Sequence, residues 1–232
     1  MAQHIKTNGV ILRRTNYGEA DRIITFLSPD NGQLSALARS VRRERSKLAG
    51  GIELLSICEF NLVRGNNNID GLWTLTGARI ITYFDQIVTN YERMQFSYDF
   101  LKLVARLGDS IDTPELYYIL TDGLAGLNNM AIDLKLVQAW CYLRLARLQG
   151  GELNLITDNN GMQLVEGADY NFDKSEGVFI YAPQGGQYDS ETIKLLRLMT
   201  VNPPTVLSKI RGITSDTIQK VLFLTQYAIE SI

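Results

Sequence analysis

The sequence predicts an α+β fold, in which a small five-stranded β-barrel precedes an α-helical bundle that carries a small β insertion. Three observations support this prediction. Short apolar stretches separated by turn residues fill the first 80 residues, and apolar residues recur at helical spacing from residue 84 onward. Turn residues and one β-type stretch then interrupt the helical pattern. We therefore expect domains over residues 1–80 and 81–232, with the insertion at residues 152–188.

The first domain contains five strand candidates, at residues 10–12, 21–27, 33–39, 53–63 and 72–76. Residues 28–32 (Ser-Pro-Asp-Asn-Gly) predict a hairpin between the second and third candidates, because these residue types favour turns. Five strands in so short a module fit a partly open Greek-key barrel of the OB type.

The second domain contains five helix candidates. The first covers residues 84–107, the second opens at Thr113-Pro114, and the third covers residues 134–148. Short connections predict that these three pack as an antiparallel bundle. Ser190 is expected to cap a fourth helix that runs to Met199, and Ser215 to start a last one. Between the third and fourth helices, residues 177–183 indicate a strand of the insertion.

A basic segment at residues 39–47 is the strongest functional signal. It holds five cations against one carboxylate, Glu44, although the whole chain has a net charge of −2. Such a cluster repels itself unless an anion neutralises it, and the planar arginine side chain pairs with phosphate oxygens two at a time. The segment therefore predicts contact with a nucleic-acid backbone, the simpler alternative being a solvated surface. The predicted contacts are Arg39, Arg42, Arg43, Arg45 and Lys47.

Other residues of the first domain could extend this surface. Residues 1–80 carry 11 Lys and Arg against 7 Asp and Glu, whereas the remainder carries 12 against 18. Tyr17 lies in a polar turn and is a candidate for stacking on a base. Trp73 shares a strand face with Leu75, which favours a place in the core. The candidate cations are Arg13, Arg14 and Arg22, which Glu19 and Asp21 could instead pair with, together with Arg64 and Arg79.

The sequence offers no catalytic constellation. His4 is the only histidine and lies in a terminal segment that we expect to fray, and no phosphate-binding P-loop motif is present. Cys58 and Cys141 sit among apolar residues, which indicates buried reduced thiols and not a zinc site. No apolar run approaches the ~18 residues of a membrane span, and residues 1–7 lack the apolar core of a signal peptide. We therefore expect a cytoplasmic protein that is not an enzyme.

Several blocks, in their order and spacing, resemble the RecO family of bacterial recombination mediators. The blocks are Gly-Val-Ile-Leu-Arg-Arg at residues 9–14, Tyr-Gly-Glu-Ala-Asp-Arg-Ile-Ile-Thr-Phe at 17–26, Gly-Gln-Leu at 32–34, Ala-Arg-Ser-Val-Arg-Arg at 38–43, Ser-Lys-Leu-Ala-Gly at 46–50, Arg-Gly at 64–65 and Leu-Thr at 75–76. The match is close over residues 8–80 and only architectural beyond them.

The resemblance implies an N-terminal OB fold, a helical domain, and binding of single- and double-stranded DNA. It also implies annealing of complementary strands, partnership with RecR, and recombinase loading on strands coated by single-strand-binding protein. We accordingly expect a nucleoid-associated bacterial protein with RecF and the recombinase RecA as indirect partners. The family further suggests that the helical domain docks the C-terminal tail of single-strand-binding protein in an apolar pocket rimmed by cations. Candidates for that rim are Lys102, Arg106, Arg144 and Arg147.

The chain departs from the family in its insertion. Many relatives carry four cysteines there, in two pairs that bind zinc, whereas residues 153–188 of this chain contain none. No zinc or other cofactor is therefore expected. Two alternative functions stay open: a non-catalytic OB-fold adaptor that binds a protein such as RecR, and an RNA-binding OB protein.

Overall fold

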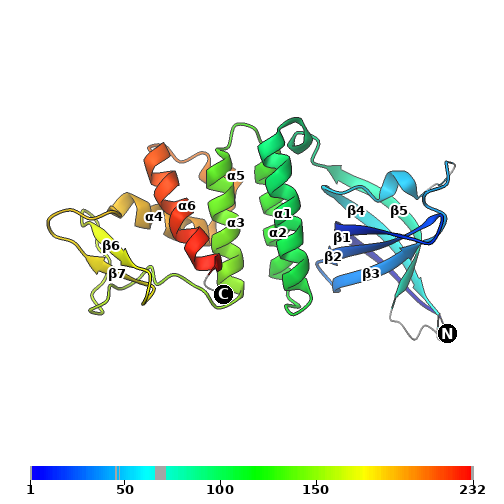
Figure 1. The fold of residues 1–232 in the computed structure, drawn as a ribbon, viewed down its shortest axis with the longest axis horizontal. Helices are drawn as coiled ribbons and strands as arrows, with labels where there is room; N and C mark the ends of the chain where they lie inside the picture. The colour runs from blue at the N-terminus through cyan, green and yellow to red at the C-terminus, as the bar shows by residue number, and fades with distance from the viewer. Residues whose placement is uncertain (1, 45, 47, 66–71, 231–232) are drawn as a thin grey trace. The chain divides into compact units, whose positions relative to one another are not determined.

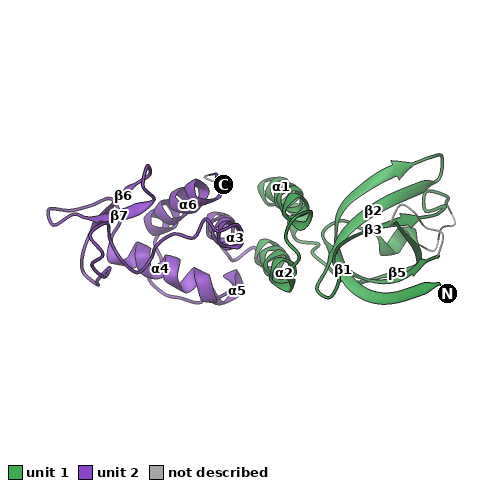
Figure 2. Ribbon diagram, turned by 90° about the horizontal axis from the view of Figure 1, so that it is seen from below, with its two compact units in different colours: residues 1–128 green, residues 129–232 purple. Residues whose placement is uncertain are grey.

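The computed structural model describes residues 2–44, 46, 48–65 and 72–230. The chain separates into two compact units, Met1–Asn128 and Asn129–Ile232, which Figures 1 and 2 show as ribbons. The boundary falls after Asn128 and not after residue 80, where the sequence pattern changes. The reason is that helices α1 (Tyr91–Gly108) and α2 (Pro114–Asn128) pack with each other and against barrel strands.

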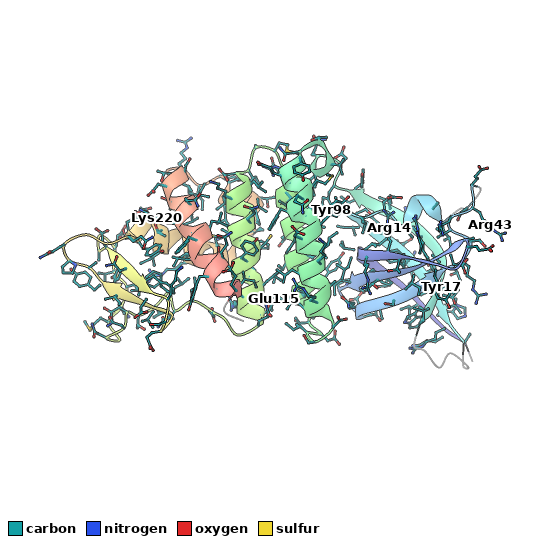
Figure 3. All side chains as sticks on the ribbon, in the orientation of Figure 1. Arg14, Tyr17, Arg43, Tyr98, Glu115 and Lys220 are labelled. Atoms are coloured by element: carbon teal, nitrogen blue, oxygen red, sulfur yellow. The ribbon has the colours of Figure 1, made fainter. Side chains whose placement is uncertain are left out.

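The first unit begins with a closed barrel whose strands follow the order β1-β2-β3-β5-β4. The predicted OB-type barrel is thus confirmed, but it is closed and not partly open. The first half of β1 pairs with β4 and its second half pairs with β2, whereas β3 and β5 close the barrel in parallel. Figure 3 labels two side chains of β1, Arg14 and Tyr17. The strands are β1 (Gln3–Tyr17), β2 (Asp21–Ser28), β3 (Gly32–Ala38), β4 (Ser56–Arg64) and β5 (Trp73–Tyr83).

The first strand is much longer than residues 10–12. His4 pairs with Val63 of β4, so the expectation of a frayed terminal segment was wrong. Exposed polar residues such as Lys6 and Asn8 occupy the outward positions of this strand. A search for apolar stretches therefore does not detect its first half. The hairpin prediction is confirmed, since β2 ends at Ser28 and β3 begins at Gly32, whose φ of 60° suits glycine.

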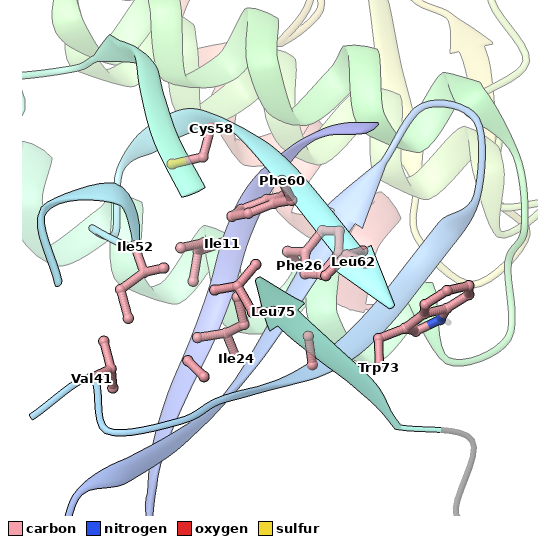
Figure 4. Packing of buried hydrophobic residues seen from close by; sticks show 12 residues of the cluster. Ile11, Ile24, Phe26, Val41, Ile52, Cys58, Phe60, Leu62, Trp73 and Leu75 are labelled. Atoms are coloured by element: carbon pink, nitrogen blue, oxygen red, sulfur yellow. The ribbon is translucent and has the colours of Figure 1, made fainter. Parts of the chain in front are cut away.

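The barrel interior is filled by large apolar side chains (Figure 4). The rings of Phe26 and Phe60 lie 4.5 Å apart between their centroids, and both side chains are fully buried. Gly9 makes this packing possible, because a Cβ there would come within 2.7 Å of the Phe26 ring. Trp73 is buried as predicted. The barrel cluster consists of Ile11, Ile24, Phe26, Ala36, Ala38, Val41, Ile52, Cys58, Phe60, Leu62, Trp73 and Leu75.

Both cysteines are buried free thiols, as the sequence predicted. Burial raises the pKa of the Cys58 thiol, and it raises the pKa of the Cys141 thiol further. A thiol held in its protonated form is a poor metal ligand and a poor nucleophile. The two side chains therefore serve the cores of their respective units.

Helix α1 starts at Tyr91, seven residues later than expected. Phe84 continues the barrel, since its N–H donates to the carbonyl of Leu55, and a short 3₁₀ turn at Ile87–Thr89 follows. Asn90 then caps the helix, because its side chain accepts a hydrogen bond from the N–H of Arg93. Arg93 is buried and donates to the carbonyl of Leu127 at 2.9 Å, which ties the start of α1 to the end of α2.

Helix α3 (Leu134–Leu148) is central to the second unit. It packs with α6 (Ser215–Glu230), α4 (Ser190–Val201) and a short helix, α5 (Pro204–Leu207). The three consecutive helices expected to form one bundle are therefore distributed between two units. No helix in the described part of the chain is long and apolar enough to cross a bilayer.

The fourth helix is capped by Asp189 and not by Ser190. The Asp189 carboxylate accepts hydrogen bonds from the N–H and the hydroxyl of Thr192, both at 2.8 Å. A carboxylate neutralises the positive end of a helix better than a hydroxyl does. Lys220, labelled in Figure 3, also pairs with Asp189, at 3.2 Å, and with Asp216, at 2.7 Å, and so joins α6 to the start of α4.

The insertion contains a two-stranded sheet, β6 (Tyr170–Asp173) and β7 (Val178–Tyr181). Only the second of these strands was expected. Tyr170, Phe179 and Tyr188 form its buried aromatic centre, with each of the other two rings edge-on to Phe179. Arg197 of α4 donates three hydrogen bonds of 2.7–3.1 Å, two to the carbonyl of Leu155 and one to that of Leu164. These contacts hold the insertion against the helices.

Replacement of Arg197 by Met should lower the free energy of unfolding of the second unit by about 1–2 kcal/mol, because hydrogen bonds from a charged group to two carbonyls are lost. Urea unfolding followed by the fluorescence of Trp140, in a Trp73→Phe background, measures this change. Lys194→Met is the matched control, since Lys194 lies one turn earlier and its one ion pair among the described residues is with Glu191, at 3.8 Å. Equal unfolding midpoints for the two variants would show that the Arg197 hydrogen bonds do not hold the insertion.

Candidate nucleic-acid interface

The outer face of the sheet formed by β1, β2 and β3 carries Arg13, Thr15 and Tyr17, all of which are exposed. In the strand register Arg13 lies opposite Thr25, and Thr15 lies opposite Ile23. Side chains alternate along a strand, so these three residues share one side of β1, whereas Ile11, before the irregularity in the β1–β2 register, belongs to the barrel cluster. The Tyr17 side chain is 56% exposed at the end of β1, which leaves its ring accessible for stacking, as the sequence suggested. We call this surface the β1–β3 face.

The basic loop at residues 39–44 follows β3, and its backbone is fixed to the turn between β1 and β2. The Asp21 carboxylate accepts a hydrogen bond from the N–H of Ser40 at 2.6 Å, and Ser40 adopts a positive φ of 53°. The N–H of Arg42 donates to the carbonyl of Ala20 at 2.9 Å. Val41 is buried in the barrel core. The loop is therefore held in place at the end of the β1–β3 face, beside Tyr17.

The arginines of this loop project from the fixed backbone. Arg39, Arg42 and Arg43 are exposed, and none forms an ion pair with another described residue. The Arg42 side chain donates to the carbonyl of Glu19 at 3.1 Å and leaves its other donors available. Figure 3 shows Arg43 at the periphery of the barrel. Arg45 and Lys47, predicted to belong to the same cluster, lie outside the described residues.

Arg14 and Arg22 have partners within the barrel unit. Arg14 is largely buried, pairs with Glu53 at 2.9 Å and donates to the carbonyl of Ile52. Arg22 donates to the side chain of Asn16 at 3.1 Å. Neither of them pairs with Glu19 or Asp21, the carboxylates that the sequence suggested. Arg14 in particular has a structural role, which makes it a weaker candidate for DNA contact than Arg13.

Arg64 and Arg79 lie on β4 and β5, away from the β1–β3 face. Arg64 donates to the side chain of Gln3 at 2.8 Å, and its guanidinium lies 4.6 Å from the centroid of the Trp73 ring. Arg79 approaches Glu59 at 3.6 Å, and Glu59 also pairs with Lys6 at 3.0 Å. The hydrogen bond from Lys6, with Arg79 nearby, holds the pKa of Glu59 below its usual value. Glu59 thus engages Lys6 and Arg79 at once, and Arg64 is held by Gln3 and Trp73.

A cleft of about 760 Å³ opens between the β1–β3 face and helix α1. Cations from both walls line it: Arg13 and Arg14 from β1, and Lys102 and Arg106 from α1. Tyr98 contributes a half-buried ring on the same side of α1. Figure 3 labels Tyr98 on the helix and Arg14 on the barrel.

The position of α1 against the barrel is fixed by direct contacts. Gln33 of β3 donates to the Asp109 carboxylate at 2.6 Å. Gly108 permits this approach, because a Cβ there would lie 2.5 Å from the Gln33 side-chain oxygen. Both walls of the cleft therefore belong to one compact unit.

The four cations expected to rim a pocket for a partner lie in both units. Lys102 and Arg106 line the cleft, and Lys102 also pairs with Asp99 at 2.9 Å. Arg144 of α3 lies over the Trp140 ring at 5.4 Å, and Arg147 lies 3.6 Å from Glu152. The structure thus brings together the first two of these residues within the first unit.

Sequence reasoning did not associate Arg13 with Lys102 and Arg106, and it did not single out Tyr98. One signal was present, because Tyr98, Lys102 and Arg106 recur at intervals of four and therefore share one face of a helix. The docking of that face against β1 was not visible, since it depends on contacts between segments about 90 residues apart.

Comparison with known proteins supports the fold and the resemblance. The family model described as "Recombination protein O N terminal" matches residues 1–84. Three relatives named "DNA repair protein RecO" illustrate the similarity. The one from Acetivibrio thermocellus is 36% identical over 44% of this chain and 39% of its own length. The one from Dehalococcoides mccartyi is 34% identical over 53% and 48%. The one from Heliobacterium modesticaldum is 32% identical over 66% and 55%.

The chain thus spans about half the length of the curated relatives that it matches. The matched family region covers the barrel and ends at Phe84, the residue that follows β5. It includes the β1–β3 face and the basic loop. The family match and the relatives together support membership of the RecO family, most directly for residues 1–84.

Proposed function

We propose that this protein acts in DNA repair and recombination by binding DNA through the β1–β3 face and the basic loop. The observation that carries the proposal is the fixed position of Arg39, Arg42 and Arg43 beside the exposed ring of Tyr17. In OB folds, oligonucleotides bind to the face of the second and third strands and to the loop between the first and second strands. Both features are present here, and the loop adds fixed positive charge for phosphate.

The contacts available on this surface suit binding without sequence preference. Arginine side chains bind phosphate oxygens, which are the same for every sequence, and an aromatic ring stacks on any base. A protein that holds strands in this way leaves their pairing edges free. We therefore propose that it anneals complementary strands and helps to load recombinase on strands coated by single-strand-binding protein. The same proposal includes RecR, RecF, RecA and single-strand-binding protein as partners in the bacterial cytoplasm.

Catalysis forms no part of this proposal. His4 lies in β1 and pairs with Val63 of β4, and burial raises the pKa of both thiols. The surface described above offers cations, hydroxyls and one ring, and these groups bind and position a strand. A protein adaptor or an RNA-binding protein would present a similar surface, and competition experiments with RNA and with candidate partner proteins separate these alternatives.

We also propose that the second unit needs no zinc. The donor set supports this proposal, since among the described residues no group of three or more His, Cys, Asp or Glu side chains is placed to hold an ion. The aromatic centre of Tyr170, Phe179 and Tyr188 occupies the insertion, and Arg197 joins it to α4. We therefore propose that packing and hydrogen bonds stabilise the fold of the insertion, as bound zinc does in a zinc module.

Replacement of Arg42 and Arg43 by Ala should weaken binding to every DNA sequence alike. Two lost phosphate contacts should reduce the slope of log K against log salt by about 1.8 on duplex DNA, from an initial value of about −4 to −7. Fluorescence anisotropy with labelled oligonucleotides over a salt series measures both quantities. Lys6→Ala/Arg79→Ala is the matched control, since it removes two exposed cations that pair with Glu59 and lie outside the basic loop. Unchanged affinity and slope in the Arg42/Arg43 variant would exclude the basic loop as the contact.

Chelation should leave the protein folded. The melting temperature, followed by circular dichroism, is expected to be the same with and without EDTA, and elemental analysis of the purified protein should find less than one tenth of a zinc ion per chain, on the order of a trace contaminant. Stoichiometric zinc, or a lower melting temperature in EDTA, would contradict the proposal of a metal-free insertion.

A further inference from the structure

The cleft between the β1–β3 face and α1 has the composition of a binding site for an anionic chain. Arg13 and Arg106 stand on opposite walls, are exposed, and form no hydrogen bond or ion pair with another described side chain. Lys102 pairs with Asp99, but both side chains are more than half exposed, and exposed pairs of this kind contribute little and exchange readily. The pairing therefore leaves Lys102 able to bind a phosphate.

The carboxylate that lines the cleft is already engaged. Asp109 accepts a hydrogen bond of 2.6 Å from the Gln33 side chain, which holds it at the end of the cleft beside β3. The cleft lining thus offers a ligand three cations, Arg13, Lys102 and Arg106, and contains one carboxylate, Asp109. The floor between them is apolar, with Leu12 from β1 and Leu101 from α1. A ligand with anionic groups along its chain and flat apolar groups between them suits this arrangement.

Tyr98, Lys102 and Arg106 form a stripe along the side of α1 that lines the cleft. Residues four apart on a helix lie above one another, so a ring and two cations follow in sequence. Proteins that bind single-stranded nucleic acid combine cations along the backbone with aromatic faces for the bases. The stripe has both elements on one rigid helix.

The cleft is also continuous with the surface proposed to bind DNA. Arg13 lines the cleft and stands in the same outward row of β1 as Thr15 and Tyr17. From Arg13 to Tyr17 the strand covers about 13 Å, at about 3.3 Å per residue. Beyond Tyr17 lies the basic loop, held by Asp21. A strand that contacts the loop can therefore continue along β1 into the cleft, which favours a nucleic acid over a short acidic peptide.

We propose that this cleft binds one strand of single-stranded DNA and gives the protein a preference for single-stranded over duplex DNA. The inference rests on the proposed function, because it extends the same surface. Only unpaired bases can turn toward Tyr98 and the apolar floor, since the bases of a duplex are stacked and paired in its interior. The basic loop, in contrast, binds phosphates that both forms of DNA present. The cleft thus adds contacts that a duplex does not make.

Lys102→Gln/Arg106→Gln and Tyr98→Ala test this proposal in the full chain. Anisotropy is measured over a salt series with a labelled single strand and with a duplex of the same sequence. The Lys102/Arg106 variant should lose roughly tenfold in affinity for the single strand, and its salt slope should fall by about 1.4, since each phosphate contributes about 0.7 on single strands. Tyr98→Ala should also bind the single strand roughly tenfold more weakly. Duplex affinity should stay within about twofold for both variants.

Lys194→Gln/Arg211→Gln is the matched control. It removes one Lys and one Arg from exposed positions of the second unit, and Lys194 pairs with Glu191 three residues earlier, as Lys102 does with Asp99. An equal loss of single-strand affinity in this control would overturn the proposal, because bulk charge would explain it. Circular dichroism and melting temperatures establish that the variants remain folded.

Further outcomes separate this inference from the proposed function. Unchanged single-strand binding in both cleft variants, with binding still weakened by Arg42→Ala/Arg43→Ala, would overturn the inference alone. Equal losses on single strands and duplexes would overturn the claimed preference. Intact DNA binding, with loss of binding to a labelled peptide of Asp and Phe residues, would assign the cleft to a protein partner instead. Absence of salt-dependent DNA binding by the unmodified protein would overturn the proposed function itself.

Discussion

The packing of Phe26 against Phe60 inside the closed barrel constrains everything that the first unit presents to its surroundings. Their centroids lie 4.5 Å apart, and Gly9 leaves the space that the Phe26 ring needs. Because side chains alternate along each strand, burying one set of residues fixes the other set outward. A shift of one residue in the β1–β2 register would move Arg13 and Tyr17 to the opposite side of the strand. The β1–β3 face is therefore a consequence of how the interior is filled.

The cations of the first unit fall into two groups that composition cannot separate. Arg14 and the buried Arg93 hold segments of the unit together through Glu53 and the carbonyl of Leu127. Arg13, Arg42 and Arg43 are exposed on a fixed backbone. A buried cation must be paired to offset its lost hydration, whereas an exposed one keeps its capacity for a ligand. The proposed DNA surface consists of the second group.

The barrel was predictable because its signals are local. The turn at residues 28–32 and the alternation in β3 identify the hairpin from sequence alone. The length of β1 was not predictable, since its polar outward residues conceal a strand that pairs with two partners. The starts of α1 and α4 were also misplaced by the sequence pattern. Both helices begin where a side chain, Asn90 or Asp189, accepts a hydrogen bond from a backbone N–H of the first turn.

The candidate site was predictable in its residue types and not in its extent. A run of arginines against one carboxylate identifies the basic loop, but the brace from Asp21 to Ser40 is a contact between segments 19 residues apart. The cleft depends on a longer connection, in which Gln33 reaches Asp109 and brings α1 to the barrel. Such contacts leave no pattern in a single sequence, because many exposed polar residues could form a hydrogen bond of this kind and nothing local in the sequence identifies the partner.

In the proposed complex, one strand of DNA follows a path from the basic loop, along β1, to α1. Photo-crosslinking of a bromouracil-substituted single strand, followed by mass spectrometry of the crosslinked peptides, tests this path directly. We expect crosslinks within residues 13–44 and within residues 95–109, both competed by unlabelled single strand. Crosslinks confined to β4 and β5, or to residues 129–232, would contradict it.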